Sequence, residues 1–274
     1  MLYRAWQRCY SPDSREEKQG VALAPDNTDT LWIASEGNDP GTRPNQLVQV
    51  DTAGAILNKI GLPAEIEACR LASSNTGNLD NGFEGVAVLP MQNGRYQLLV
   101  AQQLPWDYTT PECEDLDDEP GYTRIWIYDP VAMTWDFVPY ELAPVPANAS
   151  WVGLSEITRV GDGSYVLIEH DNRTGDFAAL KTLIRVSLAD ATDGITAEEK
   201  TVYDLIPDLK ATHGWITDKP EGVAINRHGE VFVVTDNDGV GDWSGETWFL
   251  KLGNVDDLFE FEGGDEDENE DGEN

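Results

Sequence analysis

The sequence predicts an all-β fold, a β-propeller of four-stranded antiparallel blades, and three observations predict it. A strand–turn–strand unit occurs four times, with starts about 65 to 70 residues apart. A further strand-like segment follows each copy, and no helical pattern lies between the copies. Three or four short antiparallel strands per repeat are typical of a propeller blade, which buries its faces against neighbouring blades.

The best-defined copy is KPEGVAINRHGEVFVVTDND, from Lys219 to Asp238. It predicts a strand over 222–225, a tight turn over 226–229 and a β-branched strand over 231–235. An acidic exit follows the second strand. We therefore take this copy as the template for the others.

Three further copies are FEGVAVLPMQNGRYQLLVAQQ at 83–103, LSEITRVGDGSYVLIEHDN at 154–172 and KQGVALAPDNTDTLWIASEGN at 18–38. The string EGVA at 84–87 repeats the string at 221–224, while the copy at 18–38 has Gln19 in place of the Glu. The predicted third strands are 47–50, 124–128, 183–188 and 246–252.

The domain boundaries follow from composition. We expect one propeller domain over residues 1–255 and a disordered, acidic low-complexity tail over 256–274. A strand candidate at 2–6 stands alone, and we expect it to complete the final blade and cover its edge. The segment 198–206 is the predicted outer strand of the third blade, and 139–149 and 207–217 are predicted connectors.

The formal net charge is −33, from 51 acidic and 18 basic residues. Eleven acids lie from Asp256 onward, so 40 acids against 18 bases leave the body near −22. This balance argues against nucleic acid and against anionic membrane as partners. The acidity indicates either a solvated surface suited to solubility or high salt, or in part a cation site.

Cys9, Cys69 and Cys113 fit no metal spacing and no disulfide framework. One bridge, such as Cys69 to Cys113, is compatible with the sequence, but the spacing does not select it. No stretch is apolar enough for a membrane span, and the first residues lack the apolar core of a secretory signal. Either the chain stays inside the cell or a leader has been removed.

The longest insertion is 104–122, with six acids between Glu112 and Glu119. A loop of this length is often functional in a compact domain. A lid or a calcium-binding loop and a plain surface excursion remain equal alternatives.

Repetition places acidic side chains around the propeller axis, because equivalent positions of the inner strands form a ring. Glu84, Glu156 and Glu221 are predicted to share one such position, with Gln19 as the fourth member. The strand exits supply a second set, which comprises Glu36, Gln102 or Gln103, Glu169, Asp171, Asp236 and Asp238.

Carboxylates that meet near an axis repel one another and need a cation or a proton. Oxygen ligands without His or Cys favour calcium, so the predicted metal ligands are carboxylates of both sets. They are Glu36, Glu84, Glu156, Glu169, Asp171, Glu221, Asp236 and Asp238. Alternatively, each Glu accepts backbone N–H bonds within its blade, and the TDND exit is an Asx turn.

Other catalytic patterns find little support. There is no nucleophile elbow, phosphate loop, dinucleotide fingerprint or zinc signature. His170 lies between two acids at a strand exit and is either an acid or base or a structural histidine. The predicted catalytic residues are Glu221, Asp236 and His170.

The strings NGFEGVAVLP, LSEITRVGDGSYVLIEHDN and KPEGVAINRHGEVFVVTDNDG resemble the repeated signatures of the phytase-like family, described as having esterase-like activity of phytase. The resemblance covers 81–252 well and 19–50 weakly. It implies a β-propeller, generally exported to the periplasm or outside, which hydrolyses phosphoric or carboxylic esters with the help of calcium. Glu84, Glu221, Asp236 and Asp238 match the family's acidic signature residues.

Basic residues that would hold a polyphosphate are scarce, so an anionic substrate would be repelled unless calcium inverted the local field. The expected function is a calcium-dependent ester or phosphoester hydrolase acting on a small molecule. A non-catalytic binding propeller with structural calcium and a lactonase-type calcium enzyme are the alternatives. The sequence leaves the oligomeric state open.

Overall fold

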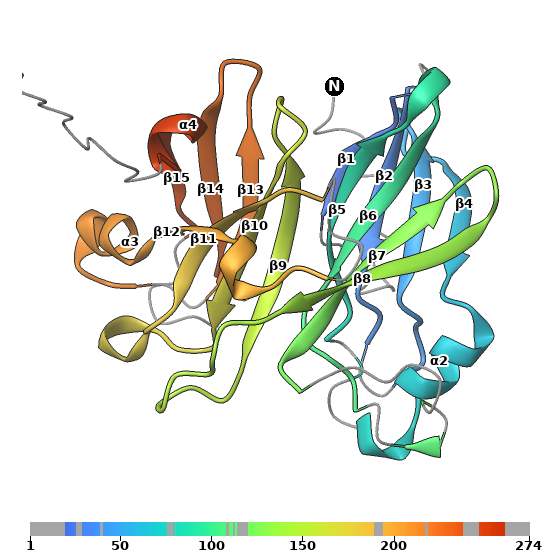
Figure 1. Ribbon diagram of the computed structural model, residues 1–274, viewed down its shortest axis with the longest axis horizontal. Helices are drawn as coiled ribbons and strands as arrows, with labels where there is room; N and C mark the ends of the chain where they lie inside the picture. The colour runs from blue at the N-terminus through green and yellow to red at the C-terminus, as the bar shows by residue number, and fades with distance from the viewer. Residues whose placement is uncertain are drawn as a thin grey trace, which may run out of the picture.

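The computed structural model describes residues 20–25, 29–38, 41–75, 79, 81–107, 110–111, 113, 120–188, 194–216, 219–237 and 247–260. These residues form four antiparallel sheets arranged as the blades of a β-propeller, which confirms the predicted fold class (Figure 1). Within the described stretches, no helix combines the length and apolar character that spanning a bilayer requires.

The strands of each sheet follow one another in chain order, so each blade is a meander. Blade 1 comprises β1 Val21–Leu23, β2 Thr30–Ser35, β3 Gln46–Asp51 and β4 Ile56–Gly61. Blade 2 comprises β5 Phe83–Pro90, β6 Tyr96–Gln102, β7 Tyr122–Asp129 and β8 Thr134–Glu141. Blade 3 comprises β9 Val152–Arg159, β10 Tyr165–Asp171, β11 Lys181–Val186 and β12 Thr201–Asp204. Blade 4 comprises β13 Lys219–Ile225, β14 Glu230–Asp236 and β15 Phe249–Asn254.

The blades pack face to face, so the middle strands β2 and β10 are buried along their whole length. Three apolar cores join consecutive blades. Trp126 and Phe83 belong to the core between blades 1 and 2, Leu154 and Tyr140 to that between blades 2 and 3, and Val233 to that between blades 3 and 4. Each blade thus fixes the position of the next.

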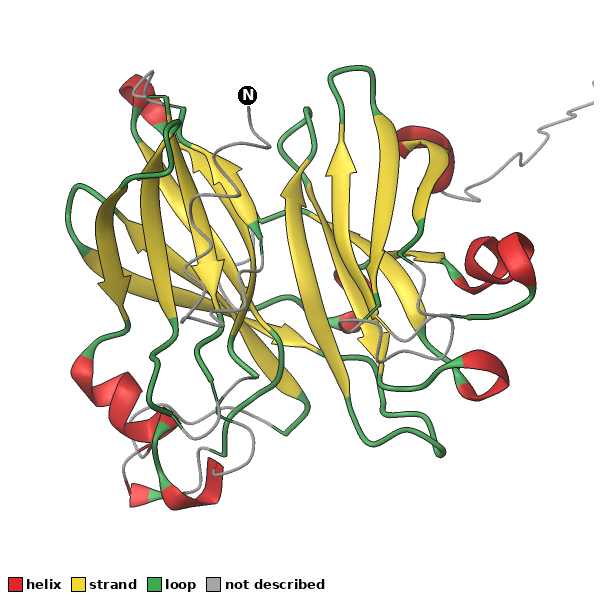
Figure 2. Ribbon diagram, turned by 180° about the vertical axis from the view of Figure 1, so that it is seen from behind, coloured by secondary structure: helices red, strands yellow, loops and turns green. Residues whose placement is uncertain are grey.

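Helices lie outside the sheets (Figure 2). They are α2 Ala64–Arg70, α3 Ile206–His213 and α4 Val255–Leu258, with short 3₁₀ turns at Ser73–Asn75, Gln92–Gly94, Gly175–Phe177 and Ala197–Glu199. The predicted connector 207–217 joins β12 to β13 as expected, and α3 occupies most of it. Pro207 stands in the first turn of α3, and Gly214 ends the helix with φ 74°.

Chain ends differ from the predicted boundaries. The acidic segment was expected to begin at Asp256, yet α4 includes Asp256 and Asp257, and the Phe259 side chain is only 4% exposed in the core between blades 3 and 4. Folded structure therefore continues to Glu260. The predicted edge strand 2–6 lies outside the described residues.

Cys69 at the end of α2 and Cys113 in the insertion form a disulfide. Both sulfurs lie in the core between blades 1 and 2. The bridge therefore ties the long insertion to the segment that follows blade 1.

Candidate active site at the propeller mouth

The inner strands β1, β5, β9 and β13 lie side by side, and they all begin at the same end of the blades. We call this end the mouth. Backbone contact holds the strands close there: Gly20 N donates to Glu84 O, and a Cβ at Gly20 would lie 2.5 Å from Val86 N. A Cβ at Gly85 would lie 2.4 Å from Ile157 N. These two positions therefore need glycine.

Each of the three longer inner strands has a β-bulge near its first residues. The pairing skips Glu84 and Gly85 in β5, Ser155 in β9 and Glu221 in β13. A bulge redirects the side chain of the extra residue. The Glu-Gly repeat thus encodes a bulge that directs a carboxylate at the mouth.

The register corrects the predicted ring at one position. Ser155, not Glu156, is the residue of β9 that corresponds to Glu84 and Glu221. Its hydroxyl donates to Pro220 O at 2.7 Å and so links β9 to β13. Glu156 lies one residue further along, and its Oε1 accepts from Ile157 N at 2.8 Å.

Glu84 is the centre of an acidic cluster, which we define as Glu36, Glu84, Glu156 and Glu221. Burial raises the pKa of Glu84 well above its ordinary value, and repulsion from Glu36 and Glu221 and a hydrogen bond with Glu36 raise it further. Lys219 opposes this shift. The raised pKa favours the protonated form of Glu84, because burial and the neighbouring negative charges both oppose its ionisation.

Glu156 extends the cluster toward blade 3. Burial raises its pKa well above the ordinary value, its bond from Ile157 N lowers it, and repulsion from Glu221 raises it. Its Oε1 would lie 2.7 Å from a Cβ on Gly85, so this carboxylate lies against β5. The four carboxylates therefore come from four blades and influence one another across the mouth.

The donor chemistry of this cluster fits a hard cation. Among the described residues, Glu84 Oε2 is buried and has no hydrogen-bond partner, and carboxylate oxygens are the ligands that calcium prefers. The described residues contain no place where three or more His, Cys, Asp or Glu side chains already lie close enough to hold a metal ion. Binding of a cation would thus require Glu84 to be ionised and the carboxylates to draw together.

Glu169 was predicted as a ligand, but the protein itself occupies its oxygens. Tyr140 Oη donates to Oε2 at 2.8 Å, Ala143 N donates to Oε1 at 2.5 Å, and Lys200 Nζ lies 3.1 Å from Oε2. The Lys200 ammonium also lies 3.9 Å from the centre of the Tyr140 ring. Glu169 therefore joins blades 2 and 3, and we leave it out of the proposed ligand set.

Asp171 is likewise engaged. Its Oδ1 lies 3.1 Å from Lys181 Nζ, and its Oδ2 accepts from the backbone N of Ala179 and Leu180. Burial raises the pKa of Asp171, but Lys181 and the backbone N–H groups of Ala179 and Arg173 outweigh it, so the pKa is lowered. Asp171 is thus a buried, charged member of an ion pair.

His170 lies buried between these acids. Burial, with Lys181, lowers its pKa to about 3, so the imidazole is neutral near pH 7. Its Nδ1 lies 2.9 Å from Asp171 O and its ring lies 5.4 Å from the Trp151 ring, edge to face. Nδ1 therefore carries the proton, and within the described residues Nε2 is a buried acceptor without a partner.

Asp236 is exposed at the end of β14, opposite Lys219 at the start of β13. It thus lies at the rim of the mouth. Asp238 and Gln19 fall outside the described residues, as does most of the acidic run 112–119.

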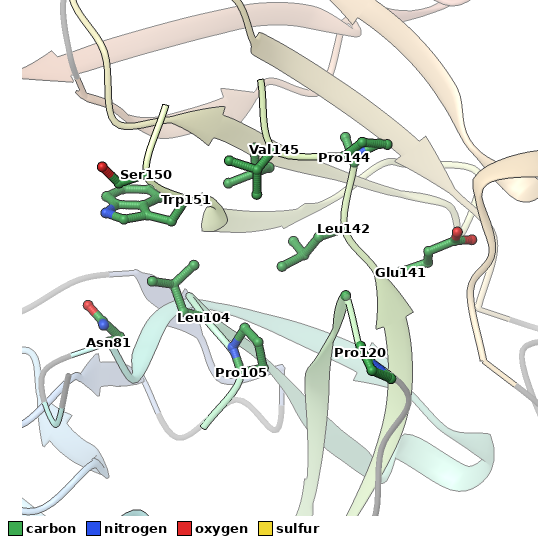
Figure 3. A pocket seen from close by; sticks show the side chains of 13 residues that line it. Asn81, Leu104, Pro105, Pro120, Glu141, Leu142, Pro144, Val145, Ser150 and Trp151 are labelled. Carbon is green, nitrogen blue, oxygen red and sulfur yellow. The ribbon is translucent and has the colours of Figure 1, made fainter. Parts of the chain in front are cut away.

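Sequence reasoning missed a cavity of about 500 Å³ beside the mouth, with Trp151, Leu104 and Leu142 in its wall (Figure 3). Its lining comes from the insertion after β6 and from the Pro- and Ala-rich segment after β8. Both segments stood out in the sequence as irregular and apolar in part, which was the available signal.

The comparisons with solved structures give low sequence identities. A GH43 glycoside hydrolase with endo-xylanase and exo-arabinofuranosidase activity is 8% identical (TM-score 0.45), over 89% of this chain and 43% of that chain. A luciferin-regenerating enzyme is 10% identical (TM-score 0.42; 87% and 63%). The α-L-arabinanase of Penicillium chrysogenum is 14% identical (TM-score 0.44; 89% and 66%). The chain thus spans less than two thirds of the length of each.

No curated protein matches the chain. A family model described as phytase-like, esterase-like activity of phytase, matches residues 20–239. This range includes most of the four repeats and all of the acidic cluster. The chain therefore belongs to the phytase-like family.

Proposed function

We propose that the protein is a calcium-dependent hydrolase of carboxylic or phosphoric esters, with its site at the mouth. The observation that carries the proposal is the acidic cluster, in which four blades contribute carboxylates, and burial and repulsion within the cluster raise the pKa values of Glu84 and Glu156. Such perturbed carboxyl groups are typical of functional sites. The family description agrees with ester hydrolysis.

Glu36, Glu84, Glu156 and Glu221 would hold the cation, and Asp236 at the rim would complete the set. When bound there, calcium would polarise an ester oxygen and lower the pKa of a bound water. Among the residues of the chain, Glu221 is half-buried at the mouth and is the candidate base that takes the proton of the attacking water. His170, neutral and buried, would accept a hydrogen bond at Nε2 but could not act as an acid near pH 7.

The disulfide supports an oxidising compartment, since such bonds are rare in the cytosol. We therefore propose a periplasmic or extracellular location, with a small-molecule ester as the partner. A lactone is a further ester that the same site would accept.

The double variant Glu221→Gln/Asp236→Asn tests the proposal. We expect it to fold, as judged by circular dichroism, but to lose calcium binding by calorimetry and turnover of aryl esters, phosphomonoesters and lactones. The control Glu198→Gln/Asp257→Asn removes the same charge from exposed positions and should retain both properties. Full turnover in the first variant, or wild-type turnover in excess chelator, would refute the proposed site.

Calcium that raises the melting temperature of a protein without turnover on any ester would instead favour a binding propeller with structural calcium. The same experiments therefore separate the two functions.

A further inference from the structure

The cavity beside the mouth lies between blades 2 and 3. Five segments form it, each at the end of the blades where the inner strands begin. They are Asn81 before β5, Leu104 and Pro105 after β6, Pro120 and Gly121 before β7, 141–145 from the last residue of β8 onward, and 150–152 at the start of β9. A volume of about 500 Å³ is in the range of small-molecule sites. The cavity and the acidic cluster thus lie at the same end of the molecule.

Apolar side chains line part of the cavity wall. In Figure 3, Leu104, Leu142, Val145 and Trp151 face the same space from opposite sides. Three prolines, at 105, 120 and 144, remove backbone donors from the wall. The apolar side chains would gain from contact with hydrocarbon.

The cavity offers an anion no positive charge. The residues that line it include neither Lys nor Arg. Glu141 is the charged member of the lining, and its Oε2 accepts from Ala197 N at 2.7 Å, directed away from the cavity in Figure 3. A phosphate group would therefore be repelled here.

Two segments of the cavity wall lead directly along the chain to residues of the acidic cluster. Asn81 stands three residues before Glu84, and Val152 stands four residues before Glu156. Leu154 N donates to Gln103 O at 3.1 Å, which joins the exit of β6 to the start of β9 between cavity and mouth. Trp151 also packs on His170. A ligand in the cavity would thus lie beside both groups of site residues.

We propose that this cavity binds the apolar acyl or aryl portion of an uncharged carboxylic ester and so selects carboxylic esters over phosphate esters. The inference rests on the proposed function for the hydrolysis, but the binding rests on the cavity alone. Water would add to the ester carbonyl, and the C–O bond would break to give a carboxylic acid and an alcohol.

Two measurements test the proposal. The first compares hydrolysis of 4-nitrophenyl butyrate and 4-nitrophenyl phosphate by the wild type, Trp151→Ala and Leu142→Glu. We expect the butyrate ester to be preferred, and its KM to rise about tenfold in both variants while kcat changes little. Met133→Ala, which removes an exposed apolar side chain of the β7–β8 turn, is the matched control and should leave KM unchanged.

The second measurement is calorimetric binding of N-phenylbutanamide, an amide that this ester chemistry would leave intact. We expect binding by the wild type and Met133→Ala, and at least a tenfold weaker affinity in Trp151→Ala. Should Leu142→Glu fail to fold, Trp151→Ala and the wild type still decide the result.

The outcomes separate the two proposals. Amide binding that depends on Trp151, without hydrolysis of any ester, would support the cavity and refute the proposed function. Hydrolysis with an unchanged KM in Trp151→Ala and no amide binding would overturn the cavity inference and leave the proposed function standing. A preference for the phosphate ester would also overturn it.

Discussion

The acids at the exit of β10 and the acids of the cluster look alike in sequence but differ in their surroundings. Asp171 and Glu169 each have a lysine within 3.1 Å and backbone amides as donors. Glu84 instead has Glu36 and Glu221 as neighbours, which raise its pKa, and only Lys219 opposes them. The same residue type therefore forms ion pairs in blade 3 and has a raised pKa at the mouth.

The charged groups around each carboxylate, rather than the carboxylate itself, therefore determine whether it is structural. Lys181 and Lys200 come from strand β11 and from the residue before β12, so blade 3 supplies its own cations. The cluster joins four blades, and its charge would be balanced by a proton or a bound ion. The predictions below test this contrast.

The largest effect should follow Lys181→Met, which leaves Asp171 buried without its ion-pair partner. We expect the free energy of unfolding to fall by about 3–5 kcal/mol, as for other broken buried pairs. Urea denaturation measures it. The control Lys210→Met breaks the exposed Lys210–Asp176 pair, whose atoms are 3.9 Å apart, and should not change the midpoint. Equal losses in both variants would contradict the contrast.

Acid should act on blade 3 through His170. The pKa is about 3 in the folded protein against about 6.5 unfolded, so below pH 6.5 the unfolded chain binds more protons and stability falls as pH falls toward 3. This difference costs about 3 kcal/mol at pH 4. Denaturation between pH 7 and 4 should show a smaller loss for His170→Gln. His228→Gln, at an exposed turn, should behave as wild type.

A smaller effect of opposite sign is expected from Glu84→Gln. Removing one of two opposed carboxyl groups should stabilise the calcium-free protein by about 1 kcal/mol, because repulsion and the cost of burying charge are relieved. Thermal melts in chelator check this. Added calcium should raise the melting temperature of the wild type more than that of the variant. Destabilisation in chelator would show that Glu84 is a structural acceptor, while Glu198→Gln should match the wild type.

The smallest effect is expected from Asp236→Asn. Its carboxylate is exposed at the rim, so the urea midpoint in chelator should not change. If calorimetry shows weaker calcium binding without a loss of stability, Asp236 acts as a calcium ligand together with the acidic cluster. A loss of stability comparable to that of Lys181→Met would place it instead with the paired acids of blade 3.

The repeats predicted the fold well because each blade encodes its hairpin locally. Asn226 and Gly229 form the expected turn, in which Asn226 Oδ1 accepts from His228 N and Glu230 N, and Gly229 has φ 77°. The bulge at Ser155 was not predicted, since a one-residue change of register leaves the letters of the repeat similar. The lysine partners of Glu169 and Asp171 were missed because they lie 31 and 10 residues away.

The disulfide has a mechanical consequence. If the chain is pulled from its two ends, the disulfide keeps the loop between Cys69 and Cys113 closed. This loop spans 44 residues, so about 150 Å of chain cannot be extended. Strands β5 and β6 lie inside that loop, so tension bypasses the strand that carries Glu84. With the disulfide formed, the pulling force would therefore not act directly on the strand that carries Glu84. With the disulfide reduced, that strand would be pulled like its neighbours.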